Sequence, residues 1–279
     1  MNYRHIYHAG NFADVIKHIV LMRVLDYLKQ KDKAFFVLDT HAGIGIYDLD
    51  ADQARRTAEA DDGIARVMAH ADTAPEAVRA YVDLVRGFNR GDEWRTYPGS
   101  PAITHSLIRD QDRMVVNELH PDDVVTLEHH MGRDDRVRVE HMDAYQVIKA
   151  LLPPPERRGM VLVDPPFEVT DEFARMTKAL IDAHKRWATG VYAFWYPIKD
   201  PRVIARWHND LADTGIPKIM AVDFMIRPAS DVTRLNGSGL VLVNAPWTLE
   251  SELNTILPWL VSTLTKGAGS FTITHLTGE

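Results

Sequence analysis

The stretch Ala34–Gly45, AFFVLDTHAGIG, decides the fold, because an apolar run leads into Asp39 and a glycine-containing loop follows at once. Such a run, ending in a polar residue and a tight turn, is typical of a buried strand in a parallel sheet. Ligands of open α/β sheets bind at the carboxyl ends of these strands, where glycine lets the backbone approach them closely. Tyr47 and Asp48 follow Gly45, so the loop does not complete the G-x-G-x-x-G dinucleotide fingerprint. The loop alone therefore fits either a ligand site or a simple turn.

Six further apolar runs, separated by stretches long enough for helices, predict the rest of the sheet. The runs are Met114–Leu119, Val137–His141, Met160–Asp164, Val191–Tyr196, Met220–Ile226 and Gly239–Ala245. Helices are expected around 121–131, 144–152, 171–187, 201–213 and 249–266. The alternation favours an α/β fold with one mostly parallel sheet, which we expect to have seven strands with an antiparallel member at its edge.

Residues 48–97 interrupt this alternation, because their composition is typical of helices and they contain no candidate strand. We interpret them as a helical insertion, so that residues 1–47 and 98–279 form one Rossmann-like domain. A core helix is expected to restart near 101, with Ser100 as its N-cap and Pro101 in its first turn. Residues 48–93 hold eleven acidic and six basic side chains, so we do not expect the insertion to contact nucleic acid.

Composition limits the function classes. The chain has 279 residues, 32 Lys and Arg against 39 Asp and Glu, and no cysteine. The lack of cysteine excludes disulfides, cysteine-ligated zinc and a cysteine nucleophile, and it suits a reducing cytoplasm. No apolar run approaches the length of about 18 residues that a membrane helix needs, so we expect a cytoplasmic protein. The net charge of −7 argues against coating nucleic acid, but residues 1–33 carry six bases against three acids and predict a local basic patch.

Two acidic residues lie where a cofactor that contains adenosine would need them. Glu118 ends the second predicted strand, where a carboxylate can accept hydrogen bonds from both ribose hydroxyls. It follows Gly45 by 73 residues. Without the insertion the distance is about 23, against the usual spacing of about 20. Asp143 and Ala144 follow the third strand and can offer adenine a carboxylate and a backbone N–H, although Asp143 is equally typical of a helix N-cap.

The fourth predicted strand ends in Asp164-Pro165-Pro166-Phe167, which predicts methyl transfer to an exocyclic amino group. The Asp164 carboxylate and the Pro165 carbonyl can accept both amino hydrogens and stabilise positive charge as the nitrogen attacks a methyl donor. The prolines fix the turn, and Phe167 can stack on a base that has left its helix. Because the neutral amine is a very weak acid, Asp164 would polarise it and accept a proton only after transfer. We therefore predict Asp164, Pro165 and Phe167 to be catalytic.

These motifs resemble the RlmJ family of bacterial 23S ribosomal RNA adenine-N6 methyltransferases, which depend on S-adenosylmethionine. The resemblance covers nearly the whole chain and rests on Tyr3-Arg4-His5, Tyr7–Asn11, Asp14-Val15, Lys17-His18, Leu38–Gly43, Tyr97–Pro101, Glu118, Asp164–Phe167 and Gly237–Leu240. His41 stands where the general methyltransferase pattern Asp-x-Gly-x-Gly has its first glycine, which is a trait of this family. Phe167 replaces the more usual tyrosine, a change that keeps stacking but loses a hydroxyl.

The resemblance implies a seven-stranded, Rossmann-like methyltransferase fold with a small helical insertion. It implies that S-adenosyl-L-methionine contacts His18, His41, Gly43, Ser100, Glu118, Asp143, Ala144 and Asp164. It further implies that the substrate RNA contacts Tyr3, Arg4, His5, Lys17 and Phe167. The expected partner is 23S ribosomal RNA, and we expect a monomer that holds no metal.

Three alternatives stay open. The same chemistry could act on DNA adenine or on a protein glutamine, since the motif specifies the amino group better than its carrier. A nicotinamide-dependent oxidoreductase could use the glycine loop and Glu118, and a catalytically silent protein could bind RNA alone. The thirteen histidines lack metal-site spacing. The aromatic run Phe194-Trp195-Tyr196 is expected to pack in the core or at its rim rather than to form a platform for a base.

Overall fold

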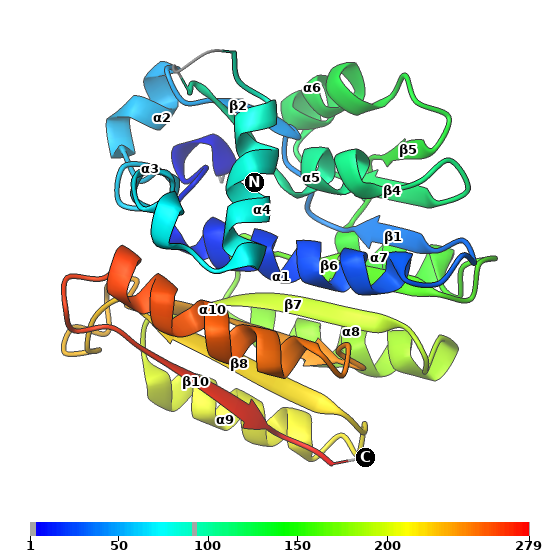
Figure 1. The fold of residues 1–279 in the computed structure, drawn as a ribbon. Coiled ribbons are helices and arrows are strands. Elements are labelled where there is room, and N and C mark those ends of the chain that lie inside the picture. The colour runs from blue at the N-terminus through cyan, green and yellow to red at the C-terminus, as the bar shows by residue number, and fades with distance from the viewer. Residues whose placement is uncertain (1–3, 91–93, 279) are drawn as a thin grey trace.

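The computed structural model describes residues 4–90 and 94–278 and shows one large sheet covered by helices (Figure 1). The sheet has eight strands, namely β1 (Phe36–Asp39), β4 (Arg113–Asn117), β5 (Val137–Glu140), β6 (Gly159–Val163), β7 (Val191–Ile198), β8 (Ile219–Met225), β9 (Gly237–Val243) and β10 (Ser270–His275). Their order across the sheet is β10-β8-β9-β7-β6-β1-β4-β5. All seven predicted runs are strands of this sheet. The five neighbouring strands β7, β6, β1, β4 and β5 are parallel to one another. The predicted α/β fold with a mostly parallel sheet is confirmed.

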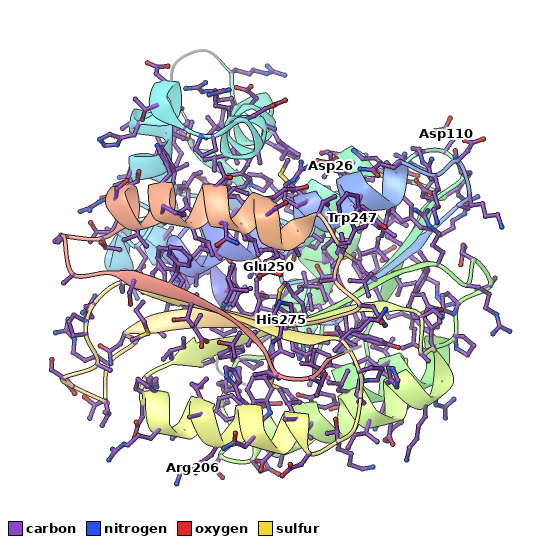
Figure 2. All side chains as sticks on the ribbon, turned by 60° about the horizontal axis from the view of Figure 1, so that its bottom comes forward. Asp26, Asp110, Arg206, Trp247, Glu250 and His275 are labelled. Atoms are coloured by element: carbon purple, nitrogen blue, oxygen red, sulfur yellow. The ribbon has the colours of Figure 1, made fainter. Side chains whose placement is uncertain are left out.

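The sheet has eight strands rather than the predicted seven, because β10 adds an antiparallel edge beside β8. Only Phe271 and Ile273 of β10 are partly buried, and polar, exposed residues alternate with them. An edge strand with one solvated face has no continuous apolar run, which is the feature that identifies the other strands. His275 Nε2 lies 2.9 Å from Glu250 Oε2 and so connects β10 to the helix that precedes it (Figure 2).

The antiparallel member of the predicted set lies inside the sheet, not at its edge. β9 is antiparallel to β7 on one side and to β8 on the other. Every residue of β9 is buried, as expected for a strand with neighbours on both sides and packing on both faces. The sheet does carry an antiparallel edge strand, but that strand is β10, which lies outside the seven predicted runs.

Helices cover both faces of the sheet (Figure 1). One face carries α1 (Phe12–Lys29), α5 (Ser100–Leu107) and α10 (Leu249–Leu264), and the other carries α7 (Ala144–Leu151), α8 (Glu172–Arg186) and α9 (Pro201–Ala212). A further helix, α6 (Pro121–Met131), packs beside β5. The predicted helices are all present, with ends that differ by at most two residues. None of the helices in the described residues is both long and apolar enough to cross a membrane.

The start of α5 differs from the prediction by one residue. Gly99 is the N-cap, and Ser100 is the first residue of the helix. The Gly99 N–H donates to the Gly45 carbonyl at 2.8 Å and holds Gly99 in the extended conformation that an N-cap requires. Ser100 therefore does not cap the helix, and its side chain is free to line the cavity described below.

Residues 48–97 fold mainly into three helices, α2 (Asp52–Thr57), α3 (Ile64–Ala69) and α4 (Glu76–Gly87), with a short 3₁₀ helix, η2 (Ala71–Thr73). Contrary to the expectation of no strand, two short strands bracket them. The strands β2 (Ile46–Asp48) and β3 (Thr96–Pro98) pair antiparallel and are too short to give an apolar run. Before α1, the N-terminal segment forms another 3₁₀ helix, η1 (His5–Tyr7), which lies against α2.

Candidate active site

Two adjoining cavities lie at the carboxyl ends of β1, β4 and β6. The first has a volume of about 230 Å³ and extends from Glu118 to Asp164. The second, of about 220 Å³, extends from Asp164 to Trp195. Both are lined by His5, Lys17, Asp164 and Pro166. The carboxylate that follows β6 therefore faces two compartments at once, at the edge of the sheet where α/β proteins bind ligands.

The glycine loop after β1 and the acid after β4 hold each other in place. Gly43 has a φ of +60°, and a Cβ atom there would lie 2.0 Å from the Tyr47 hydroxyl oxygen. Its N–H donates to Glu118 Oε2 at 2.8 Å, and the His120 N–H donates to Glu118 Oε1 at 2.7 Å. Burial raises the pKa of Glu118. Because each carboxylate oxygen can accept a second hydrogen bond, Glu118 can still receive two hydroxyl donors from a ligand.

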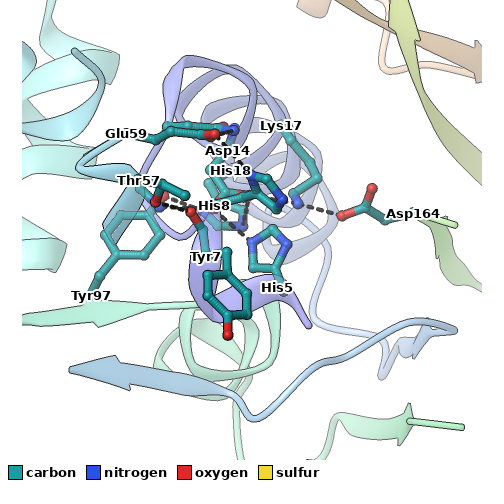
Figure 3. A network of polar contacts seen from close by, with 12 residues as sticks. His5, Tyr7, His8, Asp14, Lys17, His18, Thr57, Glu59, Tyr97 and Asp164 are labelled. Carbon is teal, nitrogen blue, oxygen red and sulfur yellow. Dashed lines mark hydrogen bonds and ion pairs between the residues drawn. The ribbon is translucent and has the colours of Figure 1, made fainter. Parts of the chain in front are cut away.

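Asp164 is bound by a buried lysine from the first long helix, α1 (Figure 3). Lys17 Nζ donates to Asp164 Oδ2 and to Asp14 Oδ1, the second at 2.7 Å. Burial alone would lower the pKa of Lys17, but the two carboxylates raise it above its ordinary value. The ammonium group therefore stays charged and orients Asp164 from one side, which leaves Asp164 Oδ1 for a ligand.

Asp14 is the centre of this network. Its Oδ2 accepts hydrogen bonds from the Gly10 N–H and from His5 Nε2, both at 2.9 Å, while its Oδ1 accepts from Lys17. Burial would raise the pKa of Asp14, but its interactions with His5 and Lys17 hold that pKa well below its usual range. The sequence analysis assigns Asp14 no role. Two signals point to it: Asp14 and Lys17 are three residues apart in the largely buried α1, and Asp14-Val15 is one of the segments that carry the RlmJ resemblance.

His18 and His41 line the first cavity together with Asp164. Burial lowers the pKa of His18 to about 3, and its Nδ1 lies 2.8 Å from the hydroxyl oxygen of Tyr97. Burial also lowers the pKa of His41 to about 4, and the Asp164 N–H donates to its Nδ1 at 3.3 Å. Both imidazoles are therefore neutral at neutral pH. His41 anchors the backbone of Asp164, whereas His18 connects α1 to Tyr97 of β3.

The aromatic residue of the motif is held in an uncommon backbone conformation. Phe167 has a φ of +52°, in the left-handed region that favours glycine, and its ring lines the second cavity. Its ring centroid lies 5.0 Å from that of Phe173 and 6.0 Å from that of Trp195, both edge to face. Trp195 also lines this cavity, and its buried Nε1 has no hydrogen-bond partner within the described part of the chain. The prediction that the aromatic run packs in the core or at its rim is confirmed for Phe194 and Tyr196, which are buried, whereas Trp195 lines the second cavity.

Comparison with known proteins identifies the family. A family model described as "Ribosomal RNA large subunit methyltransferase D, RlmJ" matches residues 32–277. The chain belongs to the RlmJ family. Two RlmJ relatives are each named "Ribosomal RNA large subunit methyltransferase J": the Escherichia coli protein is 43% identical over 280 residues, and the Haemophilus influenzae protein is 44% identical over 281 residues. Both alignments cover all of this chain and all of the relative.

The fold is shared with a solved structure over nearly its whole length. The crystal structure of protein LPL1258 from Legionella pneumophila is 34% identical to this chain and superposes with a TM-score of 0.89. The match covers 96% of this chain and 98% of that one. The structural likeness therefore extends to the segments outside the parallel strands.

The structure brings together all the residues that the RlmJ resemblance implies for the cofactor. The first cavity is lined by His18, His41, Gly43, Ser100, Glu118, Asp143, Ala144 and Asp164. Asp143 is also the N-cap of α7, because its Oδ1 accepts hydrogen bonds from the N–H groups of Tyr145 and Gln146. Its Oδ2 lies 3.3 Å from Arg175. The N-cap interpretation of Asp143 is thus confirmed, and its contact with a cofactor remains a prediction.

The residues implied for RNA are more scattered. His5, Lys17, Pro165 and Phe167 line the second cavity. Arg4 instead binds the buried Asp123 of α6, with its Nε 3.0 Å from Asp123 Oδ1. Tyr3 lies outside the described residues. Among the residues that the structure describes, no group of three or more metal-ligating His, Cys, Asp or Glu side chains is found.

The predicted basic patch in residues 1–33 is largely neutralised by ion pairs. Arg4 pairs with Asp123 and Lys17 with two carboxylates, as described above. Arg23 pairs with Asp26 and Glu252, and Lys29 pairs with Asp26. The expectation of a free basic patch is therefore wrong for these four cations. Asp14 and Asp26 lie in α1 itself, whereas Asp123, Asp164 and Glu252 come from distant elements that the sequence alone does not place beside these cations.

Proposed function

We propose that this protein is an S-adenosylmethionine-dependent methyltransferase that methylates the N6 amino group of an adenine in 23S ribosomal RNA. One observation carries the proposal: Asp164, in the Asp-Pro-Pro-Phe motif, faces both cavities of a chain that belongs to the RlmJ family. We place the cofactor in the first cavity and the flipped-out adenine in the second. The names of the relatives support ribosomal RNA as the substrate class. We expect the enzyme to act in the cytoplasm as a monomer.

The lining of the first cavity fits the parts of S-adenosylmethionine. Glu118 would accept the two ribose hydroxyls, and Asp143 with the backbone of Ala144 would hold the adenine ring. The cofactor supplies an electrophilic methyl group on a positively charged sulfur. The neutral state of His18 and His41 suits that charge, because a protonated imidazole would repel it.

The second cavity fits the reacting amino group. Lys17 occupies Asp164 Oδ2, so Oδ1 and the Pro165 carbonyl would accept the two amino hydrogens. Phe167 would stack on the base while the amino nitrogen attacks the methyl carbon in line with the departing sulfur. After transfer the nitrogen carries a positive charge and a surplus proton, which Asp164 would accept. No covalent intermediate with the protein is required.

Substitution of the motif aspartate tests the proposal. Asp164→Asn is expected to lower kcat for 23S ribosomal RNA by about 100-fold or more, because one acceptor for the amino hydrogens becomes a donor. Incorporation of label from methyl-labelled S-adenosylmethionine measures the rate, and calorimetry measures cofactor affinity separately, because Asp164 also lines the first cavity. Glu250→Gln, at a partly exposed side chain of α10, is the matched control for loss of one carboxylate (Figure 2).

Competition among substrates distinguishes the proposal from its alternatives. Ribosomal RNA, duplex DNA and a glutamine-containing peptide are supplied together with labelled cofactor, and the label is located by mass spectrometry. Label on N6 of an adenine in 23S RNA is the expected result. Label on DNA or peptide without label on RNA would refute the substrate assignment. Thermal stabilisation by NADH but not by S-adenosylmethionine would instead favour the oxidoreductase alternative.

A further inference from the structure

Glu59 connects residues 48–97 to the N-terminal segment by two hydrogen bonds (Figure 3). It lies just after α2, and its side chain is 35% exposed. Its Oε1 accepts a hydrogen bond from His8 Nδ1 at 3.0 Å, and its Oε2 accepts one from Asn11 Nδ2 at 2.9 Å. The His8 contact raises the pKa of the imidazole and opposes the effect of its burial. Both carboxylate oxygens of Glu59 are thus directed at one turn of chain.

That turn begins the helix on which the catalytic network is built. Asn11 is the N-cap of α1, and its Oδ1 accepts a hydrogen bond from the Asp14 N–H at 2.9 Å. A carboxylate only accepts hydrogen bonds, so Glu59 requires the Nδ2 side of the Asn11 amide to face it. Oδ1 is then necessarily the atom that faces Asp14. The carboxylate of Glu59 therefore determines which way the cap is oriented.

From the cap, an unbroken set of polar contacts leads to the reaction centre. The Gly10 N–H, in the same turn, donates to Asp14 Oδ2 at 2.9 Å. Asp14 Oδ1 accepts from Lys17 Nζ at 2.7 Å, and Lys17 also donates to Asp164. Lys17 and Asp14 are 4% and 1% exposed, so a displaced cap would disturb a network with little access to water.

We propose that Glu59 is a positioning residue for this active site, and that holding the turn at residues 8–11 is a function of the segment that contains it. The proposal rests on the proposed function, because it takes Asp164 as the catalytic group. Glu59 contacts neither Lys17 nor Asp164 directly; it acts through Asn11 and Asp14. It holds the cap of α1 so that Lys17 meets Asp164 in one orientation.

Other contacts keep this segment docked when Glu59 is changed. The Thr57 hydroxyl donates to the Tyr7 carbonyl, and the Ile64 N–H donates to the Gly10 carbonyl at 2.8 Å. Ile64 is completely buried in the main core. A substitution at Glu59 should therefore change its hydrogen bonds to His8 and Asn11 without detaching residues 48–97 from the N-terminal segment.

Glu59→Gln is the decisive variant, because glutamine has one acceptor and one donor group where two donors face it. While His8 donates through Nδ1, either the new amide or a reversed Asn11 amide then meets another donor. We expect kcat for RNA to fall by about 10- to 100-fold, since small displacements of catalytic groups have effects of this size. The melting temperature and the affinity for S-adenosylmethionine should change little. Asp62→Asn, which alters an exposed carboxylate of the same segment paired with Arg66, should keep wild-type kcat.

A second substitution provides a rescue that a merely structural role would not predict. In Glu59→Gln/Asn11→Asp the glutamine can donate to the new aspartate and still accept from His8, and the aspartate can still cap α1. The double variant has the same net charge as the wild type. We expect it to recover most of the lost kcat, whereas Asn11→Asp alone places two carboxylates together and should impair the enzyme.

Two outcomes overturn the inference. One is a Glu59→Gln enzyme with the same kcat as Asp62→Asn, and the other is a double variant that is as impaired as Glu59→Gln alone. Crystal structures of the variants add a readout that does not depend on the substrate. A Lys17–Asp164 contact unchanged in Glu59→Gln would contradict the positioning role. If the wild type methylates no RNA, the proposed function fails, and these structures still decide the role of Glu59.

Discussion

Lys17 is an ammonium group enclosed between two carboxylates and almost closed to water. Burial opposes its charge, but Asp14 and Asp164 raise its pKa above the ordinary value of 10.5. Burial likewise opposes the charge of Asp14, but His5 and Lys17 lower its pKa below the ordinary value of 3.8. The contribution of Lys17 to stability is lost only as the pH rises above 10.5, and that of Asp14 only as it falls below 3.8. The network therefore stays intact at any pH at which the enzyme would be assayed.

The histidine behind Lys17 titrates in the opposite sense and gives a testable pH dependence. Burial lowers the pKa of His18 from 6.5 to about 3. Between these two pH values the imidazole is protonated in the unfolded chain but neutral in the folded chain. The contribution of His18 to the free energy of unfolding is fully present above pH 6.5 and is lost as the pH falls below 6.5. Between pH 6.5 and pH 5 the free energy of unfolding should lose about 1–2 kcal/mol through His18.

Urea unfolding of His18→Asn at the two pH values measures this contribution. The variant should show a smaller loss of stability between them than the wild type does. His275→Gln, at an exposed side chain of β10, serves as the control (Figure 2). Equal losses in the wild type and in His18→Asn would contradict the buried, neutral state of His18.

At the scale of elements, β9 fits between β7 and β8 because one of its glycines makes room for a tyrosine. Gly239 is the register partner of Tyr196 on β7, and a Cβ atom there would lie 2.3 Å from Tyr196 Cζ. The Tyr196 hydroxyl donates to Asp223 Oδ1 on β8 at 2.6 Å. The Gly237–Leu240 motif that helps to identify the family thus has a packing role in the sheet rather than a role in either cavity.

Gly239→Ala is accordingly expected to destabilise the protein. Overpacking against a fully buried ring costs about 1–3 kcal/mol. Denaturant unfolding measures the change, with Gly87→Ala at the end of α4 as the control, because a Cβ atom there meets no other atom within 4 Å. A Gly239→Ala protein as stable as the wild type would show that the Tyr196 ring can move aside without penalty.

At the scale of the whole molecule, charge is distributed so that few cations remain available to RNA near the N-terminus. The net charge is −7, of which residues 1–33 contribute +3 and the other 246 residues −10. Four of the six cations in residues 1–33 are ion-paired within the protein. We therefore expect RNA binding through the N-terminal segment to rely on shape and on a flipped base more than on bulk electrostatics.

This distribution predicts a shallow salt dependence of RNA binding. Each phosphate contact to single-stranded RNA contributes about 0.7 to the slope of log affinity against log salt concentration. The affinity for a ribosomal RNA fragment is measured between about 50 and 200 mM salt. We expect a slope that corresponds to only a few phosphate contacts. A slope typical of about ten contacts would show that a basic surface elsewhere on the molecule dominates binding.

The sequence by itself determined the seven strands that show continuous apolar runs and the motif residues that meet at their carboxyl ends, but not the short or half-exposed strands β2, β3 and β10. The strands β1, β4 and β6 show as apolar runs because both their faces are buried, and parallel strands bring Gly43, Glu118 and Asp164 to one edge whatever else the chain does. The tertiary structure alone decided which charges meet. Lys17 lies 147 residues from Asp164, Arg4 lies 119 residues from Asp123, and Glu59 lies 48 residues from Asn11. Periodicity and motifs depend on residues that are close in the sequence. The partner of a buried charge depends on how distant elements pack, and that packing exists only in the folded chain.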